Sequence, residues 1–279
     1  MNILVTGAAG LLGTEITAEL KKRKIEHTGI DIDVLDITDE DAVHTYFIKH
    51  KPQSVIHCAA YTSVDKAEEE PELCHRINAY GTENIAHACS EVDSEMIYIS
   101  TDYVFGRSDD TPYETDDLLA PIDIYGKSKL AGEEAVRRHL SKFYIVRISW
   151  VFGKAGRDFV KTMLKLAQTR DEISVVDDQF GSPTYSLDAA RLLCDMALSG
   201  KYGVYHATNE GYCSWAEYAA EIMRQSGSPC RINPIPTEQY PVKTVRPKNS
   251  RLSKTSLDLA GFSRLPAWQE ALRDYLGSF

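Results

Sequence analysis

The chain has few of the features that mark membrane, secreted or metal-binding proteins. No apolar run approaches the ~18 residues needed to cross a bilayer. Its first residues lack the basic and then apolar pattern of a signal peptide. The six cysteines include no Cys-x-x-Cys pair, and the eight histidines show no paired ligand spacing. We therefore expect reduced cysteines, a cytoplasmic location, no membrane partner and no bound metal.

Clusters of positive charge are also scarce. The 279 residues carry a formal net charge of −10, and the sequence pI is near 5.3. Because a phosphate backbone attracts clustered cations, this balance argues against a general nucleic-acid binder. Any anionic ligand must instead meet local donors. Hydrophobic residues are 43% and charged residues 26%, which is ordinary for a globular enzyme.

Short apolar runs alternate with helical patterns in the first half of the chain. Repeated strand–helix–strand order implies a mostly parallel sheet with helices on both faces. The fold class is therefore α/β, a Rossmann-type doubly wound parallel sheet, in which ligands bind beyond the carboxyl ends of the strands. The expected strands are 3–5, 28–31, 54–58, 96–99 and 144–148, with helices at about 71–90 and 123–140.

Beyond Trp150 the pattern loosens and prolines become frequent. A helix at about 158–169 precedes the strand-like 173–176. A later helix at 187–198 and the strand-like 203–206 could return to the large sheet. The predicted dinucleotide-binding domain is 1–150 with 184–208 returning, and the smaller C-terminal substrate-binding lobe is 151–183 with 209–279.

A glycine-rich turn lies between the first strand and the first helix. Gly7, Gly10 and Gly13 permit a tight turn and close approach of the backbone to a pyrophosphate. The N–H groups of the following helix, at Leu11 and Leu12, would face the same anion. The Gly-x-x-Gly-x-x-Gly spacing differs from the Gly-x-Gly-x-x-Gly of other dinucleotide binders, and a purely structural turn is the alternative.

Acidic residues follow the second strand. Asp31 can accept hydrogen bonds from an adenosine ribose. This position favours NAD, because a 2′-phosphate would meet a like charge and no arginine is adjacent. Asp36 and Ile37 could line the adenine pocket, or Asp36 could simply be solvated. The cofactor is accordingly NADPH or NADH.

Tyr125 and Lys129 are four residues apart, on one face of a predicted helix. The lysine cation would stabilise phenolate and so lower the pKa of Tyr125 toward the range of a working proton donor. Lys129 would also hold a ribose hydroxyl of the nicotinamide cofactor. Thr101, 24 residues upstream of Tyr125, would donate a hydrogen bond to the same carbonyl oxygen. The alternative to a catalytic role is a surface helix that carries Tyr125 and Lys129, with Thr101 as a capping residue.

Three cationic residues in the tail could bind an anionic ligand. Arg246, Lys248 and Arg251 are clustered, and a nucleotide diphosphate is an anion that arginine binds at two points. We expect Arg246 to bind substrate. For Lys248 a solvated position is an equal alternative.

Six stretches that span nearly the whole chain resemble one enzyme family. The chain is similar to the extended short-chain dehydrogenase/reductase superfamily and, within it, to dTDP-4-dehydrorhamnose reductases, which make dTDP-L-rhamnose. Threonine at position 101, where many members of the superfamily have serine, is usual in these reductases. The stretches are CAAYTSVDKAE (58–68), STDYVFG (100–106), YGKSKLAGE (125–133), SWVFG (149–153), DQFGSPT (178–184) and RPKNSRL (246–252).

The resemblance implies roles for further residues. Ala59, Ala60 and Tyr61 should line the cofactor cleft, with Val64 beside the substrate. The side chains expected to face the sugar or its surroundings are Asp102, Tyr103, Phe105 and Trp150. An aromatic surface such as Trp150 suits the apolar face of a deoxysugar, and a core tryptophan is the alternative.

Some relatives dimerise around Mg²⁺ held by surface carboxylates. Glu15 lies where one such ligand would be, and Asp188 is a loose candidate for another. We favour the alternative that Glu15 is an exposed helical glutamate near a helix N-terminus. We therefore predict no metal, and either a monomer or a homodimer.

The expected activity is reduction of the C4 ketone of dTDP-4-dehydro-L-rhamnose to dTDP-L-rhamnose by NADPH or NADH. One alternative is a 4-keto reductase or epimerase acting on another nucleotide sugar. A dehydratase would need an Asp-Glu pair immediately after the threonine, which residues 102 and 103 lack. A second alternative is a non-catalytic regulatory subunit resembling that of methionine adenosyltransferase.

Overall fold

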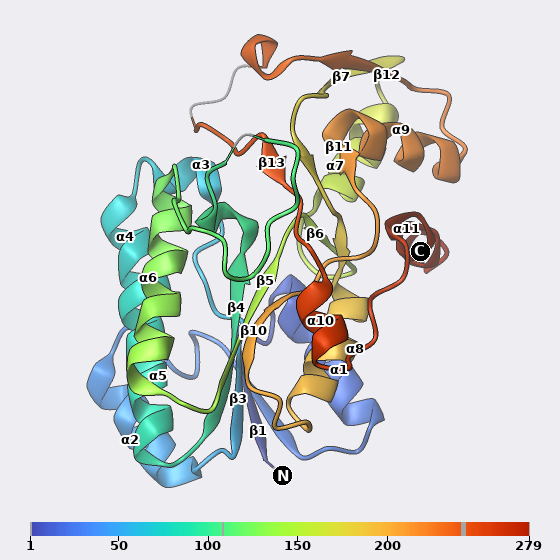
Figure 1. The fold of residues 1–279 in the computed structure, drawn as a ribbon. Helices are drawn as coiled ribbons and strands as arrows, with labels where there is room; N and C mark the ends of the chain where they lie inside the picture. Colours follow the sequence, from blue (N-terminus) through green and yellow to red (C-terminus); the bar gives the residue numbers. More distant parts are fainter. Residues whose placement is uncertain (1, 108, 241–243, 279) are drawn as a thin grey trace.

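A parallel sheet forms the centre of the molecule. The computed structural model describes residues 2–107, 109–240 and 244–278. Among them, six strands pair in the order β10-β5-β4-β3-β1-β2, and every pair is parallel (Figure 1). The strands are β1 (Ile3–Thr6), β2 (His27–Ile30), β3 (Ser54–His57), β4 (Glu95–Thr101), β5 (Phe143–Ile148) and β10 (Gly203–His206). The predicted α/β fold with a doubly wound parallel sheet is confirmed.

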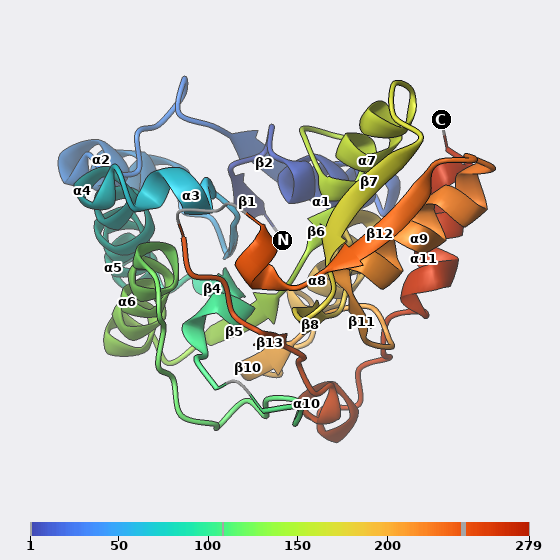
Figure 2. The ribbon, with the colours of Figure 1, turned by 90° about the horizontal axis from the view of Figure 1, so that it is seen from above.

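Helices cover both faces of this sheet. Figure 2 shows α2, α4, α5 and α6 on one side and α1 and α8 on the other. Their residues are α1 (Leu11–Lys22), α2 (Glu40–His50), α4 (Pro71–His75), α5 (Thr82–Glu91), α6 (Ile124–His139) and α8 (Ser186–Met196).

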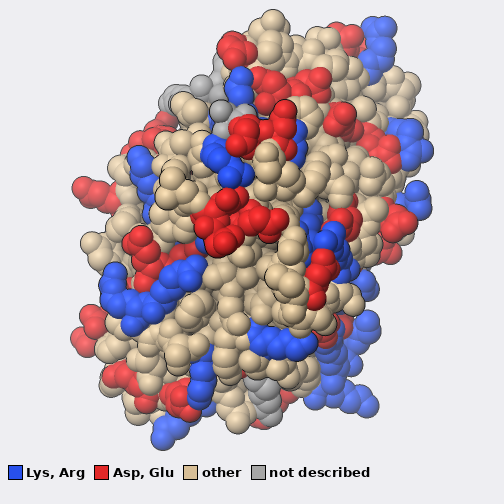
Figure 3. Space-filling view, viewed as in Figure 1, with Lys and Arg blue, Asp and Glu red and all other residues tan. Residues whose placement is uncertain are grey.

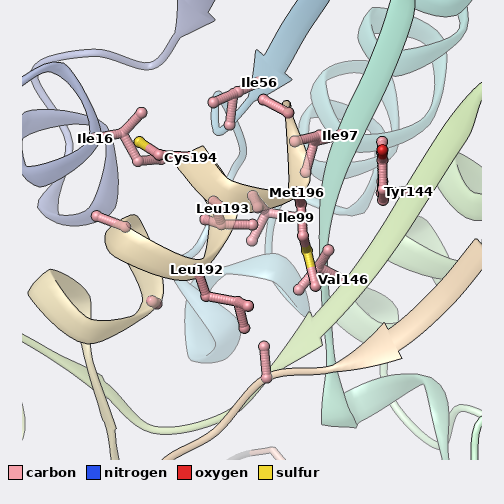
Figure 4. Packing of buried hydrophobic residues seen from close by; sticks show 14 of the residues in the cluster. Ile16, Ile56, Ile97, Ile99, Tyr144, Val146, Leu192, Leu193, Cys194 and Met196 are labelled. Carbon is pink, nitrogen blue, oxygen red and sulfur yellow. The ribbon is translucent and has the colours of Figure 1, made fainter. Parts of the chain in front are cut away.

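The two helical layers bury opposite faces of the same strands. Along β4, Ile97 and Ile99 join the core beneath α1 and α8, whereas Met96 and Tyr98 join the core beneath α2, α5 and α6. This alternation follows from the two-residue period of a strand. Figure 4 shows Ile97, Ile99 and Val146 beside side chains of α8, with Ile16 of α1 near Cys194. Both faces of the sheet are therefore packed, as the nearly continuous apolar runs predict.

Local signals set the ends of several helices. Asp39 caps α2 by accepting a hydrogen bond from Ala42 N, and Asp123 caps α6 by accepting one from Gly126 N. Such side-chain acceptors satisfy N–H groups that have no partner inside the helix. The basic residues Lys21 and Lys22 in the last turn of α1 match the negative end of its dipole.

The helix expected at 71–90 is not uniform. It consists of α4, a π-helical segment (Arg76–Gly81) and α5. A π turn inserts one extra residue and is often found near functional sites. Here it carries Asn78, which is fully buried and contacts α6 through Ser128.

A smaller lobe lies above the carboxyl ends of the strands in the view of Figure 1. Three helices and the parallel β7–β12 pair enclose a separate aromatic-rich core. The lobe includes a twelve-residue helix, α9, and the strand β12 follows it. Its helices are α7 (Phe159–Ala167), α9 (Trp215–Ser226) and α11 (Trp268–Leu276), and its strands are β7 (Glu172–Val176), β8 (Phe180–Gly181), β11 (Cys213–Ser214), β12 (Arg231–Ile235) and β13 (Asn249–Ser250).

Short elements join the lobe to the sheet. β6 (Val151–Phe152) pairs with β9 (Thr184–Tyr185), and α3 (Val64–Ala67) follows β3. α10 (Thr255–Leu259) packs its Leu257 into the core of the large sheet rather than into that of the lobe. The division into a dinucleotide-binding domain and a substrate lobe stays a prediction.

Charges of both signs are interspersed on the face shown in Figure 3. No single basic field is visible on that face, as expected from the net charge of −10. In the part of the chain that the structure describes, no helix is long and apolar enough to cross a membrane.

Candidate active site

A cleft of about 880 Å³ opens where the strand order reverses. The chain runs from β1 to β2 at one edge and then returns to β3 on the other side of β1, so the loops after β1 and β3 diverge. Such a switch point is the usual ligand site of open α/β sheets. The predicted site residues that line the cleft are Gly7, Gly10, Leu11, Leu12, Gly13, Asp31, Asp36, Ile37, Ala59, Ala60, Val64, Thr101, Asp102, Tyr103, Tyr125, Lys129, Trp150 and Arg246.

The glycine turn forms a tight backbone cradle at one end of the cleft. Gly7 has φ +65°, and a Cβ there would lie 2.6 Å from Ala59 N. A Cβ on Gly13 would lie 2.2 Å from the Gly7 carbonyl oxygen. Gly10, the N-cap of α1, has no side chain to satisfy the N–H groups of the first turn. A dinucleotide pyrophosphate therefore fits this site, because backbone donors and the helix dipole face it.

Asp31 connects the end of β2 to the glycine turn. Its carboxylate accepts hydrogen bonds from Ala9 N and Ile32 N, each at 3.0 Å. Because a carboxylate has four acceptor sites, capacity for ribose hydroxyls is left. Asp36 accepts from Thr38 N and Thr38 Oγ1, and these bonds lower its pKa.

Tyr125 and Lys129 lie one turn apart on α6, and both line the cleft. Lys129 is 3% exposed, and its Nζ lies 4.1 Å from the centre of the Tyr98 ring. The Tyr103 ring meets that of Tyr125 edge to face at 5.5 Å. A Cβ on Gly132 would lie 2.2 Å from Tyr98 Oη, so glycine lets α6 approach β4 closely. The predicted pair therefore shares one environment.

Burial changes the electrostatics expected of this pair. Burial raises the pKa of Tyr125 well above its usual range, and the nearby Asp102 raises it further. A hydrogen bond with the Thr101 side chain acts in the opposite direction. Burial also lowers the pKa of Lys129 to about 7. The net pKa of Tyr125 is therefore raised rather than lowered, because burial is the largest influence on it. The effect of Lys129 on this pKa stays a prediction.

Thr101 is the last residue of β4 and Asp102 follows it, and both line the cleft. Thr101 Oγ1 donates to Asp102 Oδ1 at 2.9 Å and accepts from Tyr103 N at 3.2 Å. Asp102 Oδ2 is buried and has no partner at hydrogen-bond geometry among the described residues, although the Ser250 side chain is near enough to lower the pKa of Asp102. Burial raises the pKa of Asp102 to about 7. A buried polar atom without a partner that lines a cleft is a natural contact for a ligand hydroxyl.

An aromatic pair closes the cleft on the side of the smaller lobe. Trp150, which follows β5, stacks on Trp215 of α9 with 3.7 Å between ring centres and 17° between planes. Trp150 has φ +48°, a backbone conformation rare for a bulky residue. The sequence alone did not suggest Trp215, because α9 comes 65 positions later and carries no motif. Arg157, another lining residue that sequence analysis missed, makes no ion pair with any residue that the structure describes.

The tail cations are not all in the cleft. Arg246 lines it, donates from Nη2 to Asp65 Oδ2 at 2.9 Å, and keeps a buried Nε without a partner among the described residues. Lys248 pairs with Asp178 at 3.1 Å and lies outside the cleft lining, as does Arg251. Of the three, Arg246 alone is placed to meet a ligand.

Two predicted contacts lie elsewhere. Phe105 is fully buried, stacks on Tyr113 at 4.1 Å and does not line the cleft, so the structure does not show it facing the sugar or its surroundings. Its ring turns into a small core because the chain leaves β4 through a 3₁₀ turn (Asp102–Val104). Tyr61 is outside the cleft lining, and its hydroxyl donates to Glu70 Oε2 at 2.7 Å. The predicted cofactor contact of the Tyr61 side chain is accordingly not seen.

Asn78 of the π-helical segment fixes the loop after β3. Its Oδ1 accepts from Tyr61 N at 2.7 Å, while its Nδ2 donates to the Tyr61 carbonyl and to Ser128 Oγ. The loop is thereby tied to α6. Sequence reasoning missed Asn78, since no local pattern indicates the π turn that aims it.

Comparison with known proteins identifies the family. Residues 1–279 match the model described as RmlD substrate binding domain. The chain belongs to this family. It is 43% identical to the spore coat polysaccharide biosynthesis protein SpsK of Bacillus subtilis, over 98% of this chain and 96% of that protein.

Solved structures agree with this membership of the RmlD family. The dTDP-4-dehydrorhamnose reductase of Clostridium acetobutylicum is 42% identical and superposes with a TM-score of 0.98, over 100% of this chain and 99% of the other. The Bacillus anthracis dTDP-4-dehydrorhamnose reductase, solved in complex with NADP, is 41% identical with a TM-score of 0.97 over the same shares. The predicted resemblance to these nicotinamide-dependent reductases is confirmed, as is the cofactor class.

The candidate dimer-metal residues are not surface carboxylates in this chain. Glu15 and Asp188 are 7% and 6% exposed. The reading of Glu15 as an exposed helical residue is therefore wrong. Asp188 accepts from Asn209 Nδ2 at 2.9 Å and pairs with Arg191 at 3.3 Å. Within the described ranges, no group of three or more histidine, cysteine or acidic side chains could hold a metal ion.

Proposed function

We propose that this protein reduces the C4 ketone of dTDP-4-dehydro-L-rhamnose to dTDP-L-rhamnose with NADPH or NADH. The observation that carries the proposal is the meeting of Thr101, Tyr125 and Lys129 in one cleft with the glycine turn. Membership of the RmlD family, whose relatives include dTDP-4-dehydrorhamnose reductases, supports the choice of substrate.

The bound dihydronicotinamide supplies the hydride, and the residues of the chain handle the oxygen and its proton. Tyr125 donates a proton to the oxygen, and its raised pKa keeps it in the protonated form that a donor requires. Thr101 hydrogen-bonds the same oxygen and stabilises its developing charge. Lys129 donates to a ribose hydroxyl of the cofactor and adds a positive charge beside the reacting oxygen.

Residues farther along the cleft bind the remainder of the two ligands. Arg246 and Arg157 are placed to meet phosphates, because each lines the cleft. The stacked Trp150 and Trp215 give an apolar wall for the deoxysugar. Buried Asp102 receives a sugar hydroxyl on its free oxygen.

The test is a substrate panel with matched tyrosine variants. Oxidation of NADPH or NADH is followed on adding each of several 4-keto-sugar nucleotides. Tyr125→Phe should lose at least about 100-fold in kcat, since proton transfer by a positioned group contributes 10²–10⁴-fold. Cofactor binding should be retained. Tyr80→Phe, at a tyrosine that is 56% exposed, is the control and should match the wild type.

Each outcome decides between the open alternatives. Consumption of one equivalent of cofactor per keto-sugar supports a reductase, and the preferred sugar of the panel names its substrate. Interconversion of sugars without net consumption would indicate an epimerase. Full activity in Tyr125→Phe would remove this residue from its role, and a stoichiometric partner with no turnover would favour a regulatory subunit.

A further inference from the structure

Glu133 and Arg147 form an ion pair that is entirely shielded from solvent. Both side chains are 0% exposed. Arg147 Nε and Nη2 each donate to one carboxylate oxygen of Glu133 at 2.8 Å, the two-point geometry of strong charge-assisted pairs. Burying two charges costs free energy that even good geometry hardly offsets. Stability alone is therefore a weak reason for this pair.

The pair connects the elements that carry the reacting groups. Glu133 lies on α6 one turn after Lys129. Ser100 Oγ donates to Glu133 Oε1 at 2.6 Å, and Ser100 immediately precedes Thr101 on β4. Arg147 belongs to β5, the neighbouring strand. One carboxylate thus holds α6, β4 and β5 together directly below the cleft.

We propose that Glu133 is a positioning residue for the reduction. Its carboxylate fixes the face of α6 that bears Tyr125 and Lys129 against the strand end that bears Thr101, and it faces Lys129 with a negative charge. The inference rests on the proposed function for the roles of these three residues.

The surroundings of Lys129 make this charge important. Glu133 is the largest influence that opposes the burial-driven fall in the pKa of Lys129 to about 7. The other titratable groups around Lys129 are uncharged near neutral pH, because burial lowers the pKa of the histidine to about 3 and raises the pKa values of the thiols and phenols. They are His57 and Cys58 at the end of β3, Cys74 on α4, Tyr98 on β4 and Tyr125 on α6.

Two cations face Glu133 itself. Arg147 binds it from β5, and Arg137 Nη2 on the next turn of α6 lies 3.8 Å from Glu133 Oε2. The Glu133 carboxylate therefore has a cationic partner on β5 and another on its own helix. Loss of the carboxylate charge would therefore leave Lys129 without its main negative neighbour and near two unpaired arginines, and its proton would dissociate at lower pH.

Two substitutions separate the effect of the Glu133 charge from the effect of its side-chain length. Glu133→Gln keeps the size and removes the charge, whereas Glu133→Asp keeps the charge and shortens the side chain. Glu134→Gln, at the exposed neighbour on the same helix, is the control. Both Glu133 variants should lose about 10- to 100-fold in kcat with little change in KM, because a small misplacement of reacting groups has that effect.

The second measurement is the pH dependence of kcat and of NADPH affinity. In Glu133→Gln the alkaline limb of kcat should move to lower pH, because Lys129 is active as the ammonium. NADPH affinity, measured by quenching of tryptophan fluorescence, should show the same shift. Glu133→Asp should keep the wild-type limb, and Glu134→Gln should match the wild type in both measurements.

A purely structural role predicts a different pattern. If Glu133→Gln loses stability but keeps the kcat and the alkaline limb of Glu134→Gln, the inference is overturned. If Glu133→Gln fails to fold, the double variant with Arg147→Met removes both buried charges. A shifted limb in that variant supports the inference, and a wild-type limb and kcat overturn it.

Failure of the proposed function would look different again. If none of the keto-sugar nucleotides in the panel causes the wild-type protein to oxidise NADPH or NADH, the reductase proposal is wrong. The pH dependence of NADPH binding in Glu133→Gln still tests the role of Glu133 in that case.

Discussion

At the scale of single residues, the cleft concentrates groups whose burial opposes their ionisation. Asp102, Tyr125 and Lys129 each have a pKa displaced toward the neutral form, and burial is the largest cause for all three. Displaced pKa values of this kind gather at functional sites, where they are maintained at the expense of stability. The burial of Asp102 therefore has a measurable consequence for folding.

Asp102→Asn should stabilise the fold at neutral pH. Burial raises the pKa of Asp102 to about 7, above its unfolded value near 4, so ionisation penalises the folded state as pH rises from about 4 to 7. Removing that carboxylate should add roughly 2–4 kcal/mol to the free energy of unfolding at pH 7 and little at pH 4. Urea denaturation at both values measures this difference.

The control for that variant is Asp116→Asn, at an exposed position. It should change the free energy of unfolding by less than about 0.5 kcal/mol at either pH. An Asp102→Asn protein no more stable at pH 7 than its parent would contradict the argument. Turnover should fall in the same variant, because the sugar loses a carboxylate contact.

At the scale of elements, local signals predict the segments whose structure is determined locally. The glycine turn, the α6 helix and its Asp123 cap follow from residues adjacent in sequence. The ring of Phe105 does not, because its direction depends on Tyr113, which packs on it from a loop. Trp215 and the π turn around Asn78 were missed for the same reason.

The raised pKa of Tyr125 has a physical origin at this scale as well. Helical spacing correctly placed Tyr125 beside Lys129, and Coulomb attraction alone would lower the pKa of the phenol. The depth to which α6 sinks against β4 is set by the contact of Gly132 with Tyr98. No periodicity in the sequence indicates how deeply α6 is buried. The effect of desolvation on the pKa of Tyr125 therefore could not be predicted from the sequence.

Ser214→Ala should weaken α9 and with it the smaller lobe. Ser214 Oγ accepts from Glu217 N at 3.0 Å, and Glu217 Oε2 accepts from Ser214 N at 2.8 Å, a reciprocal capping box. Loss of such a cap costs about 1 kcal/mol, with a range of 0.5–2. Thermal denaturation should show this loss. Ser226→Ala, at the other end of α9, should be nearly neutral, and equal losses in the two variants would rule out a capping effect.

At the scale of the whole molecule, the sheet and the smaller lobe have separate cores joined by short elements. Buried histidines lie in the larger of these parts. His57 contacts Thr6 Oγ1 at 2.7 Å and Thr82 Oγ1 at 3.2 Å, and His206 lies 3.4 Å from Arg147 Nη1. Burial lowers the pKa of each histidine to about 3.

The protein should therefore lose stability as pH falls from about 6.5 toward 3. An unfolded chain binds a proton at each histidine in that range, whereas the folded chain does not. Each could contribute on the order of 4 kcal/mol. Asp102 and Asp123, whose pKa values burial raises to about 7 and about 6, act in the opposite sense and reduce the net slope.

Urea midpoints between pH 7 and 4 measure this dependence. His57→Gln should flatten the decline, whereas His50→Gln, at an exposed histidine, should leave it unchanged. If the urea midpoint falls equally steeply with pH in both variants, His57 does not contribute to the pH dependence of stability.

The stacked tryptophans connect the large sheet to the smaller lobe at the wall of the cleft. Trp150 extends from the end of a sheet strand and Trp215 from a helix of the smaller lobe, and both form the cleft wall. Any shift of the smaller lobe relative to the sheet would therefore slide one indole over the other. A ligand that packs on both indoles would resist such a shift, so ligand binding would stabilise the contact between the two cores.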